Sequence, residues 1–223
     1  MPRTARASVG GLIYHALNRG NRESTVFHRP ADYDAFVEAL HESNRRIPMD
    51  LFGYCVMPNH FHLVLRPRAD GDLGRWMRGL LTTHALRHHR QHKTSGHVWQ
   101  GRYKAFPVQE DEHLATVLRY VERNPSRAEL VARAEHWKWS SLAAWISGDA
   151  SLYRGEPSPR ERDRGVSWVE RVNAPLSAVD LQRLRESVAR ERPFGSDDWT
   201  RRTAEALGLE STLRPRGRPR RQS

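Results

Sequence analysis

One stretch of the chain, HFHLVL at residues 60–65, constrains the fold more than any other. Histidines alternate with apolar residues over its first four positions, in a way that is typical of a β-strand, where successive side chains point to opposite faces of a sheet. His60 and His62 would then share one face, while Phe61 and Leu63 pack into a core on the other. Two imidazoles about 7 Å apart along a strand can bind one cation, although a single histidine is more often a packed or solvated residue.

A second stretch, residues 111–125, is predicted to be a helix with a buried stripe and a polar flank. Its apolar residues recur at helical spacing, and the helix must end near Asn124 because a proline follows. His113, Tyr120 and Asn124 fall on one flank, so a hydroxyl and an amide oxygen can face the same small volume. Taken alone, Tyr120 and Asn124 are more simply explained as a half-buried tyrosine and a helix cap.

The charge of the chain indicates a polyanionic partner. The 223 residues carry a formal charge of +11, and nucleic acid is the usual partner of so basic a protein, although charge alone leaves a merely basic protein open. Cys55 is the only cysteine, which excludes an internal disulfide and fits a reducing compartment. No apolar run approaches the ~20 residues of a membrane span, and the first residues lack the apolar core of a secretory signal. We therefore expect a cytosolic, nucleoid-associated protein that does not contact a membrane.

Candidate DNA contacts are concentrated in residues 94–104, a glycine-punctuated segment that interleaves aromatic and cationic residues. Such a mixture can stack on bases and hold phosphates, although Trp99 fits a buried core position equally well. A second group follows the first predicted strand, where glycine and asparagine favour a turn. The candidates from both places are Arg19, Asn21, Trp99, Arg102 and Lys104.

The order of predicted elements indicates an α+β fold. Strands are expected at residues 11–18, 49–57, 60–65 and 105–109, and helices at 30–46, 70–93 and 111–124. Pro58 and Asn59 make a tight turn, so the second and third strands form a hairpin, and Pro107 marks the fourth as an edge strand. This order suits an antiparallel sheet with helices packed on one side. A central strand can then present His60 and His62 to the flank of the last helix.

Such a site would combine two imidazoles, one amide oxygen and one phenol. Mixed nitrogen and oxygen ligands, with positions left open for phosphate oxygens, suit Mg²⁺ or Mn²⁺ better than a structural zinc. Free tyrosine has a pKa near 10 and is protonated at neutral pH. His113 lies on the same helical flank as Tyr120 and is a candidate for proton transfer with its hydroxyl.

The C-terminal third of the chain is predicted to be an appendage. Residues 136–145 form an aromatic segment that closes the core, and residues 148–165 are a boundary loop rich in proline, glycine and charge. Two short helices, at 177–192 and 197–207, follow as a helical extension or lid. The predicted division is a main domain at 8–147, an extension at 148–210 and a tail at 211–223.

The tail contains five arginines in eight residues and is expected to be disordered by itself. Its sequence PRGRP, which includes Arg216 and Arg218, resembles an AT-hook. Such a peptide lies in the minor groove of A·T-rich duplex DNA, whose depth and potential suit arginine. A nonspecific phosphate-binding arm is an equal alternative.

Four motifs together resemble a known family. They are YHALNRGN at residues 14–21, MPNHFH at 57–62, WQGRY at 99–103 and RYVERNP at 119–125. In this combination and order the chain resembles the single-tyrosine HUH transposases of the IS200-like superfamily, and within them the REP-associated tyrosine transposases. The resemblance covers about residues 8–146. It implies a ferredoxin-like sandwich, in agreement with the order of elements.

Position by position, the resemblance implies that Tyr120 is the nucleophile and that His60 and His62 bind the metal. Asn124 takes the third ligand position, where many relatives have glutamine, and keeps an amide oxygen on a shorter arm. The implied activity is metal-dependent nicking and rejoining of single-stranded DNA through a 5′-phosphotyrosine, beside hairpins of short palindromic repeats, in DNA transposition. The protein would act as a monomer or a homodimer.

Three rival functions are set against this one. A catalytically silent, sequence-specific hairpin-binding protein would keep the fold and lose the chemistry, yet all the named catalytic residues are present. A two-histidine phosphoesterase acting on RNA ends would need matching His-x-Ser/Thr motifs, which the histidine strand does not provide. A hydrolase that uses Cys55 would need a partner for the thiol, and none is evident in its strand.

Overall fold

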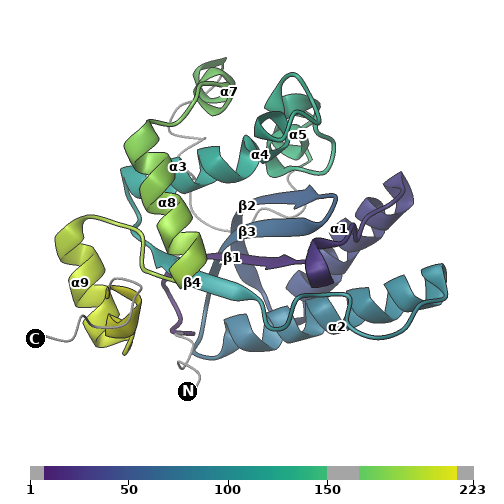
Figure 1. The fold of residues 1–223 in the computed structure, drawn as a ribbon, viewed down its shortest axis with the longest axis horizontal. Coiled ribbons are helices and arrows are strands. Elements are labelled where there is room, and N and C mark those ends of the chain that lie inside the picture. Colours follow the sequence, from purple (N-terminus) through teal and green to yellow (C-terminus); the bar gives the residue numbers. More distant parts are fainter. Residues whose placement is uncertain (1–7, 150–165, 215–223) are drawn as a thin grey trace, which may run out of the picture.

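The structure is a computed structural model and describes residues 8–149 and 166–214. At its centre lies a four-stranded antiparallel sheet in the order β2-β3-β1-β4 (Figure 1). The strands are β1 (Ile13–Arg19), β2 (Met49–Met57), β3 (His60–Pro67) and β4 (Lys104–Val108). β2 and β3 form the predicted hairpin, and the histidine strand β3 occupies the predicted central position.

Helices cover both faces of the sheet, which corrects the expectation that they pack on one side. α1 (Pro30–Arg46) and α2 (Asp72–His92) lie on one face, and α3 (Glu112–Glu122) lies on the other (Figure 1). β3 shows the reason, because Phe61 packs into the core under α1 and α2 while Val64 packs under α3. A sheet with apolar residues on both faces needs a cover on each.

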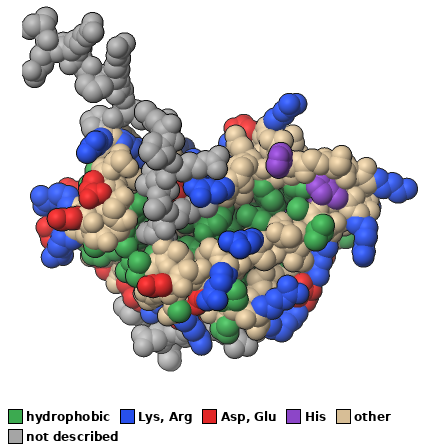
Figure 2. All heavy atoms as spheres, turned by 90° about the horizontal axis from the view of Figure 1, so that it is seen from below, with side chains coloured by type: hydrophobic (Ala, Val, Ile, Leu, Met, Phe, Trp, Pro, Cys, Tyr) green, Lys and Arg blue, Asp and Glu red, His purple; other side chains and the backbone are tan. Residues whose placement is uncertain are grey.

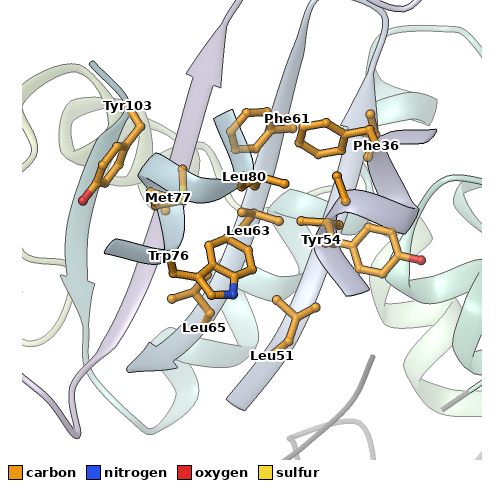
Figure 3. Packing of buried hydrophobic residues seen from close by; sticks show 14 of the residues in the cluster. Phe36, Leu51, Tyr54, Phe61, Leu63, Leu65, Trp76, Met77, Leu80 and Tyr103 are labelled. Atoms are coloured by element: carbon orange, nitrogen blue, oxygen red, sulfur yellow. The ribbon is translucent and has the colours of Figure 1, made fainter. Parts of the chain in front are cut away.

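The core on the α1–α2 side is rich in aromatic rings (Figure 3). Phe36 and Phe61 point toward each other, with ring centroids 5.0 Å apart. Trp76, Met77 and Leu80 of α2 lie over Leu63 and Leu65 of β3. This packing buries the non-histidine face of β3 and so fixes which way its histidines project.

Shorter helices complete the described chain. They are α4 (Asn124–Arg127), α5 (Ser141–Ile146), α7 (Val166–Asn173), α8 (Ala178–Arg190) and α9 (Asp197–Ala206), with 3-10 turns at Asn21–Glu23, Ala134–His136 and Glu210–Thr212. Pro125 lies in the first turn of α4, where proline is tolerated. α8 and α9 confirm the two predicted C-terminal helices, whereas α7 was not predicted. None of the helices in either described range is long and apolar enough to cross a membrane.

Both edges of the sheet are covered by later parts of the chain. On the β2 edge, the Val56 N–H donates to the Trp139 carbonyl at 2.9 Å, so the aromatic segment closes the core as predicted. On the β4 edge, the Phe194 N–H donates to the carbonyl of Pro107 at 2.9 Å. Pro107 therefore lies in an edge strand, as its missing N–H required. Covered edges protect the sheet from pairing with other chains.

The C-terminal helices share one core with α3. Trp168 of α7 and Leu184 of α8 are fully buried in the same cluster as Val117 and Leu118 of α3. The predicted extension is therefore packed against the helix that carries Tyr120. Of the predicted boundary loop, residues 150–165 lie outside the described residues.

Glu122, at the end of α3, joins α3 to α5 and α7 within this shared core. Its carboxylate is fully buried and accepts hydrogen bonds from the Ser141 hydroxyl at 2.6 Å and the Trp168 indole N–H at 3.0 Å. We expect Glu122→Ala to lower the free energy of unfolding by about 3 kcal/mol, since two buried donors lose their acceptor. Glu112→Ala is the matched control, because that side chain is 91% exposed on the same helix. Urea unfolding of both variants measures the difference, and equal losses would contradict the prediction.

Candidate active site

His60 and His62 project from β3 on the face covered by α3. Across the strand pairs, Arg19 of β1 is opposite His60, and Leu17 is opposite His62. Directly paired residues lie on the same face of a sheet, so the Arg19 side chain accompanies the histidines. The two imidazole rings are perpendicular, with centroids 5.0 Å apart. The alternation read from the sequence therefore places both rings side by side.

Each imidazole is anchored through its Nδ1 atom. His60 Nδ1 lies 2.6 Å from Asn59 Oδ1, and the other end of the Asn59 amide donates to the Glu23 carbonyl at 3.1 Å. Because an amide oxygen only accepts, His60 Nδ1 donates and its Nε2 keeps a free lone pair. His62 Nδ1 lies 2.9 Å from Nε2 of His15, a fully buried residue of β1. His15 is part of the site, and the sequence analysis did not single it out.

Tyr120 lies beside the histidines. Its ring is 5.8 Å from the His62 ring and 6.3 Å from the His15 ring, and the residue is 7% exposed. The apolar stripe of α3 sets this direction, because Val117 and Val121 are buried in the core below. Among the described residues, none forms a hydrogen bond with the Tyr120 hydroxyl.

Arg127 of α4 connects Tyr120 with Asn124. Its guanidinium group lies 5.2 Å from the centroid of the Tyr120 ring, in the geometry of a cation–π contact. It also donates a hydrogen bond of 2.7 Å to Oδ1 of Asn124, which is buried. The sequence analysis missed Arg127, although its position three residues after Asn124 places it on the same side of a helical turn.

Burial keeps the imidazoles of the site neutral. It lowers the pKa of His15 to about 3 and that of His60 to about 4, where Arg19 and Arg127 add to the effect. Burial also holds the pKa of His62 well below its usual range, and the neighbouring rings of His60 and His15 depress it further. Neutral imidazole is the form that binds metals.

These residues fit a divalent cation with mixed ligands. His60 Nε2 has its lone pair free, and His62 Nε2 is the ring nitrogen that the contact with His15 leaves unused. Asn124 Oδ1 already accepts from Arg127, but an amide oxygen has a second lone pair. Across residues 8–149 and 166–214, no three His, Cys, Asp or Glu side chains form a complete metal-binding group. A cation here would therefore need ligands from Asn124 and from the substrate.

The structure places His113 away from the phenol. Its Nδ1 lies 2.7 Å from a carboxylate oxygen of Asp111, and its ring packs against Phe194, with centroids 5.5 Å apart. Seven residues along α3 separate it from Tyr120, about 10 Å of helix. This geometry does not support proton transfer by His113.

The predicted DNA contacts divide into surface and core residues. Arg102 and Lys104 are exposed, and Asn21 is half-buried, with its backbone N–H bonded to the Val98 carbonyl. Trp99 corrects the prediction, because it is only 6% exposed. Its ring packs against other aromatic residues of the α1–α2 core and offers no free face to a base. Arg216 and Arg218 lie outside the described residues.

Cationic side chains are spread over the surface shown in Figure 2. Lys and Arg groups border an exposed strip of hydrophobic side chains on this face, while acidic groups are less frequent there. This distribution agrees with the net charge of +11. A polyanion would be attracted to such a surface.

Acid is expected to destabilise the protein because of its buried histidines. Burial lowers the pKa of His60 to about 4 and those of His15 and His84 to about 3. As pH falls below about 6.5, the unfolded chain binds protons that the folded protein excludes, so stability is full above 6.5 and is lost below it. At pH 5 each of the three residues removes about 2 kcal/mol, together enough to threaten a fold of ordinary stability. Urea unfolding at pH 7 and pH 5 tests this expectation, and equal stabilities would contradict it.

Comparisons with known proteins agree with this fold. The family model described as "Transposase IS200 like" matches residues 8–124. A protein of Haemophilus influenzae that is assigned by name to the REP-associated tyrosine transposases is 25% identical over 145 residues, 60% of this chain and 80% of the relative. A solved structure of a REP-associated tyrosine transposase bound to a REP hairpin has a TM-score of 0.57 and 18% identity, covering 72% of this chain and 93% of that one. The predicted α+β fold is confirmed by this structural match.

Proposed function

The chain belongs to the IS200-like transposase family, and we propose that it cuts and rejoins single-stranded DNA beside a hairpin through the Tyr120 hydroxyl. The observation that carries the proposal is the convergence of three elements on one site. β3 supplies two neutral imidazoles, α3 supplies a phenol within 5.8 Å of the nearer ring, and α4 supplies a guanidinium group over that phenol. Nucleophile and charge-stabilising groups thus share one small volume.

In the proposed reaction, the Tyr120 oxygen attacks a backbone phosphorus in line with the departing 3′ oxygen. The bond from phosphorus to tyrosine forms as the bond to the 3′ oxygen breaks, leaving a 5′-phosphotyrosine and a 3′-hydroxyl. The phenol proton passes to water, since no described side chain forms a hydrogen bond with the hydroxyl, and the departing 3′ oxygen takes up a proton from water. One phosphodiester replaces another, so the reverse step can rejoin strands without ATP.

His60, His62 and Asn124 would hold Mg²⁺ or Mn²⁺ beside this phosphate. When bound, such an ion offsets the charge that gathers on the phosphate oxygens during the transfer. Arg127 would stabilise the same charge, because its guanidinium group lies against the Tyr120 ring.

The proposed substrate is DNA that folds into a hairpin. The similar solved structure holds a REP hairpin, and this chain offers exposed cations near its own site. Arg19 is the register partner of His60. Lys104 and His62 are the two register partners of Leu17, so Lys104 is aligned with His62 across the sheet. Such cations position a phosphate backbone without reading its sequence. Contact of the tail with A·T-rich duplex through Arg216 and Arg218 stays a prediction from the sequence.

The proposal is tested by capturing the covalent intermediate. A hairpin oligonucleotide with single-stranded flanks, labelled on the 3′ side of the cleavage site, is incubated with the protein and Mn²⁺ and then denatured. We expect a labelled adduct that survives denaturation, and we expect none when EDTA is present. Hairpin binding with no adduct under any divalent cation would instead identify a catalytically silent binding protein.

A further inference from the structure

His15 is an unexpected third imidazole in the site. It lies on β1, where its register partners are Val64 of β3 and Phe106 of β4, so it shares the face of the catalytic histidines. It is fully buried, its ring meets the edge of Phe106 with centroids 5.0 Å apart, and its Nε2 lies 2.9 Å from His62 Nδ1. A polar ring is costly to bury unless it is hydrogen-bonded, and the contact with His62 provides that bond.

Two arrangements of the shared proton are possible for a pair of neutral rings. If His15 donates, His62 carries its own proton on Nε2 and that nitrogen cannot bind a cation. If His62 donates through Nδ1, its Nε2 lone pair is free, and the His15 proton sits on Nδ1. Nδ1 of His15 is buried without a hydrogen-bond partner among the described residues. Only the second arrangement makes His62 a ligand.

We propose that His15 is a positioning residue, which accepts the Nδ1 proton of His62 and so holds the His62 Nε2 lone pair open for the divalent cation. This inference rests on the proposed function. His60 is anchored in the same way by the Asn59 oxygen, so each ligand has one fixed acceptor behind it. His62 differs in that its acceptor is a neutral ring on another strand, which ties the orientation of the ligand to the pairing of β1 with β3.

The test compares Mn²⁺ binding by three variants of the full chain. His15→Leu removes the acceptor with little change in volume, His15→Gln replaces it with an amide oxygen, and His84→Leu is a control for the loss of a buried histidine elsewhere. We expect His15→Leu to weaken Mn²⁺ binding by about 10- to 100-fold, as loss of a partner behind a metal ligand does. His15→Gln should recover most of the affinity, and His84→Leu should match the wild type. Calorimetry measures the affinities.

A second measurement does not depend on any variant folding. Nitrogen-15 NMR of the wild-type protein with Mg²⁺ reports which ring nitrogen of His62 carries the proton, and we expect Nδ1. A proton on Nε2, or unchanged Mn²⁺ affinity in His15→Leu, would overturn the role of His15 while leaving adduct formation intact. A wild type that binds no Mn²⁺ and forms no adduct would overturn the proposed function and this inference together.

Discussion

Replacement of Tyr120 by phenylalanine is expected to abolish the covalent DNA adduct, with a loss of at least about 10⁴-fold in the rate of strand cleavage. The substitution removes only the hydroxyl oxygen. The phenylalanine ring can keep the contacts that Tyr120 makes with His62 and with the Arg127 guanidinium group. The fold and the charge of the site should therefore survive while the proposed nucleophilic oxygen is gone. Gel analysis of the denatured reaction measures the loss.

Tyr33→Phe is the matched control for this substitution. Tyr33 is also buried, but it lies on α1 under the opposite face of the sheet, where its ring stacks on Trp139 at 4.1 Å. This variant should form the adduct at the wild-type rate, and both variants should bind the hairpin with wild-type affinity. An adduct that persists in Tyr120→Phe would assign the nucleophile to another residue.

The sheet could be predicted from the sequence because its signals are local. The alternation in HFHLVL, the Pro58–Asn59 turn and the edge position of Pro107 each depend on residues within a few positions of one another. These signals placed β2, β3 and β4 to within about two residues. They could not say that helices lie on both faces, because the face on which α3 packs depends on contacts between distant segments such as Val64 and Val117.

The residues of the candidate site also divide into those that local sequence motifs reveal and those that only the folded structure reveals. His60, His62 and Tyr120 stand in motifs that carry their chemistry in residue type and spacing, and the structure brings them together. His15 and Arg127 were missed because their roles exist only in three dimensions. His15 reaches His62 across the sheet, and the reach of Arg127 depends on a second helix that starts at Asn124.

Trp99 was predicted to contact DNA but lies in the core, the opposite of a missed site residue. Its neighbours in sequence are glycine, glutamine and cations, which made a base-stacking role plausible from composition. The structure inserts the ring among Phe27, Phe36 and Phe61 instead. A large aromatic residue in a polar segment often anchors that segment to the core, and here the anchor leaves the neighbouring Arg102 exposed at the surface.

His60→Ala and His62→Ala are each expected to slow adduct formation by about 10³-fold in Mn²⁺, since loss of charge stabilisation at a transferring phosphate costs several kcal/mol. Hairpin affinity should change by less than about threefold, because phosphate contacts spread over many cations dominate DNA binding. Single-turnover adduct formation and fluorescence anisotropy measure the two quantities. His113→Ala is the control, since its ring is bonded to Asp111 and should leave both quantities unchanged.

The two histidine variants should differ in stability even though they lose similar activity. His62 is 3% exposed and its ring packs against those of His15 and Tyr120, so its truncation leaves a cavity and deprives His15 of its hydrogen bond. We expect a loss of about 2 kcal/mol for His62→Ala, and less than about 1 kcal/mol for His60→Ala, which lies nearer the surface. Equal activity loss with unequal stability loss would separate ligand chemistry from packing. Activity loss that instead scaled with instability would mean that the histidines only support the fold, and the metal-binding role would fail.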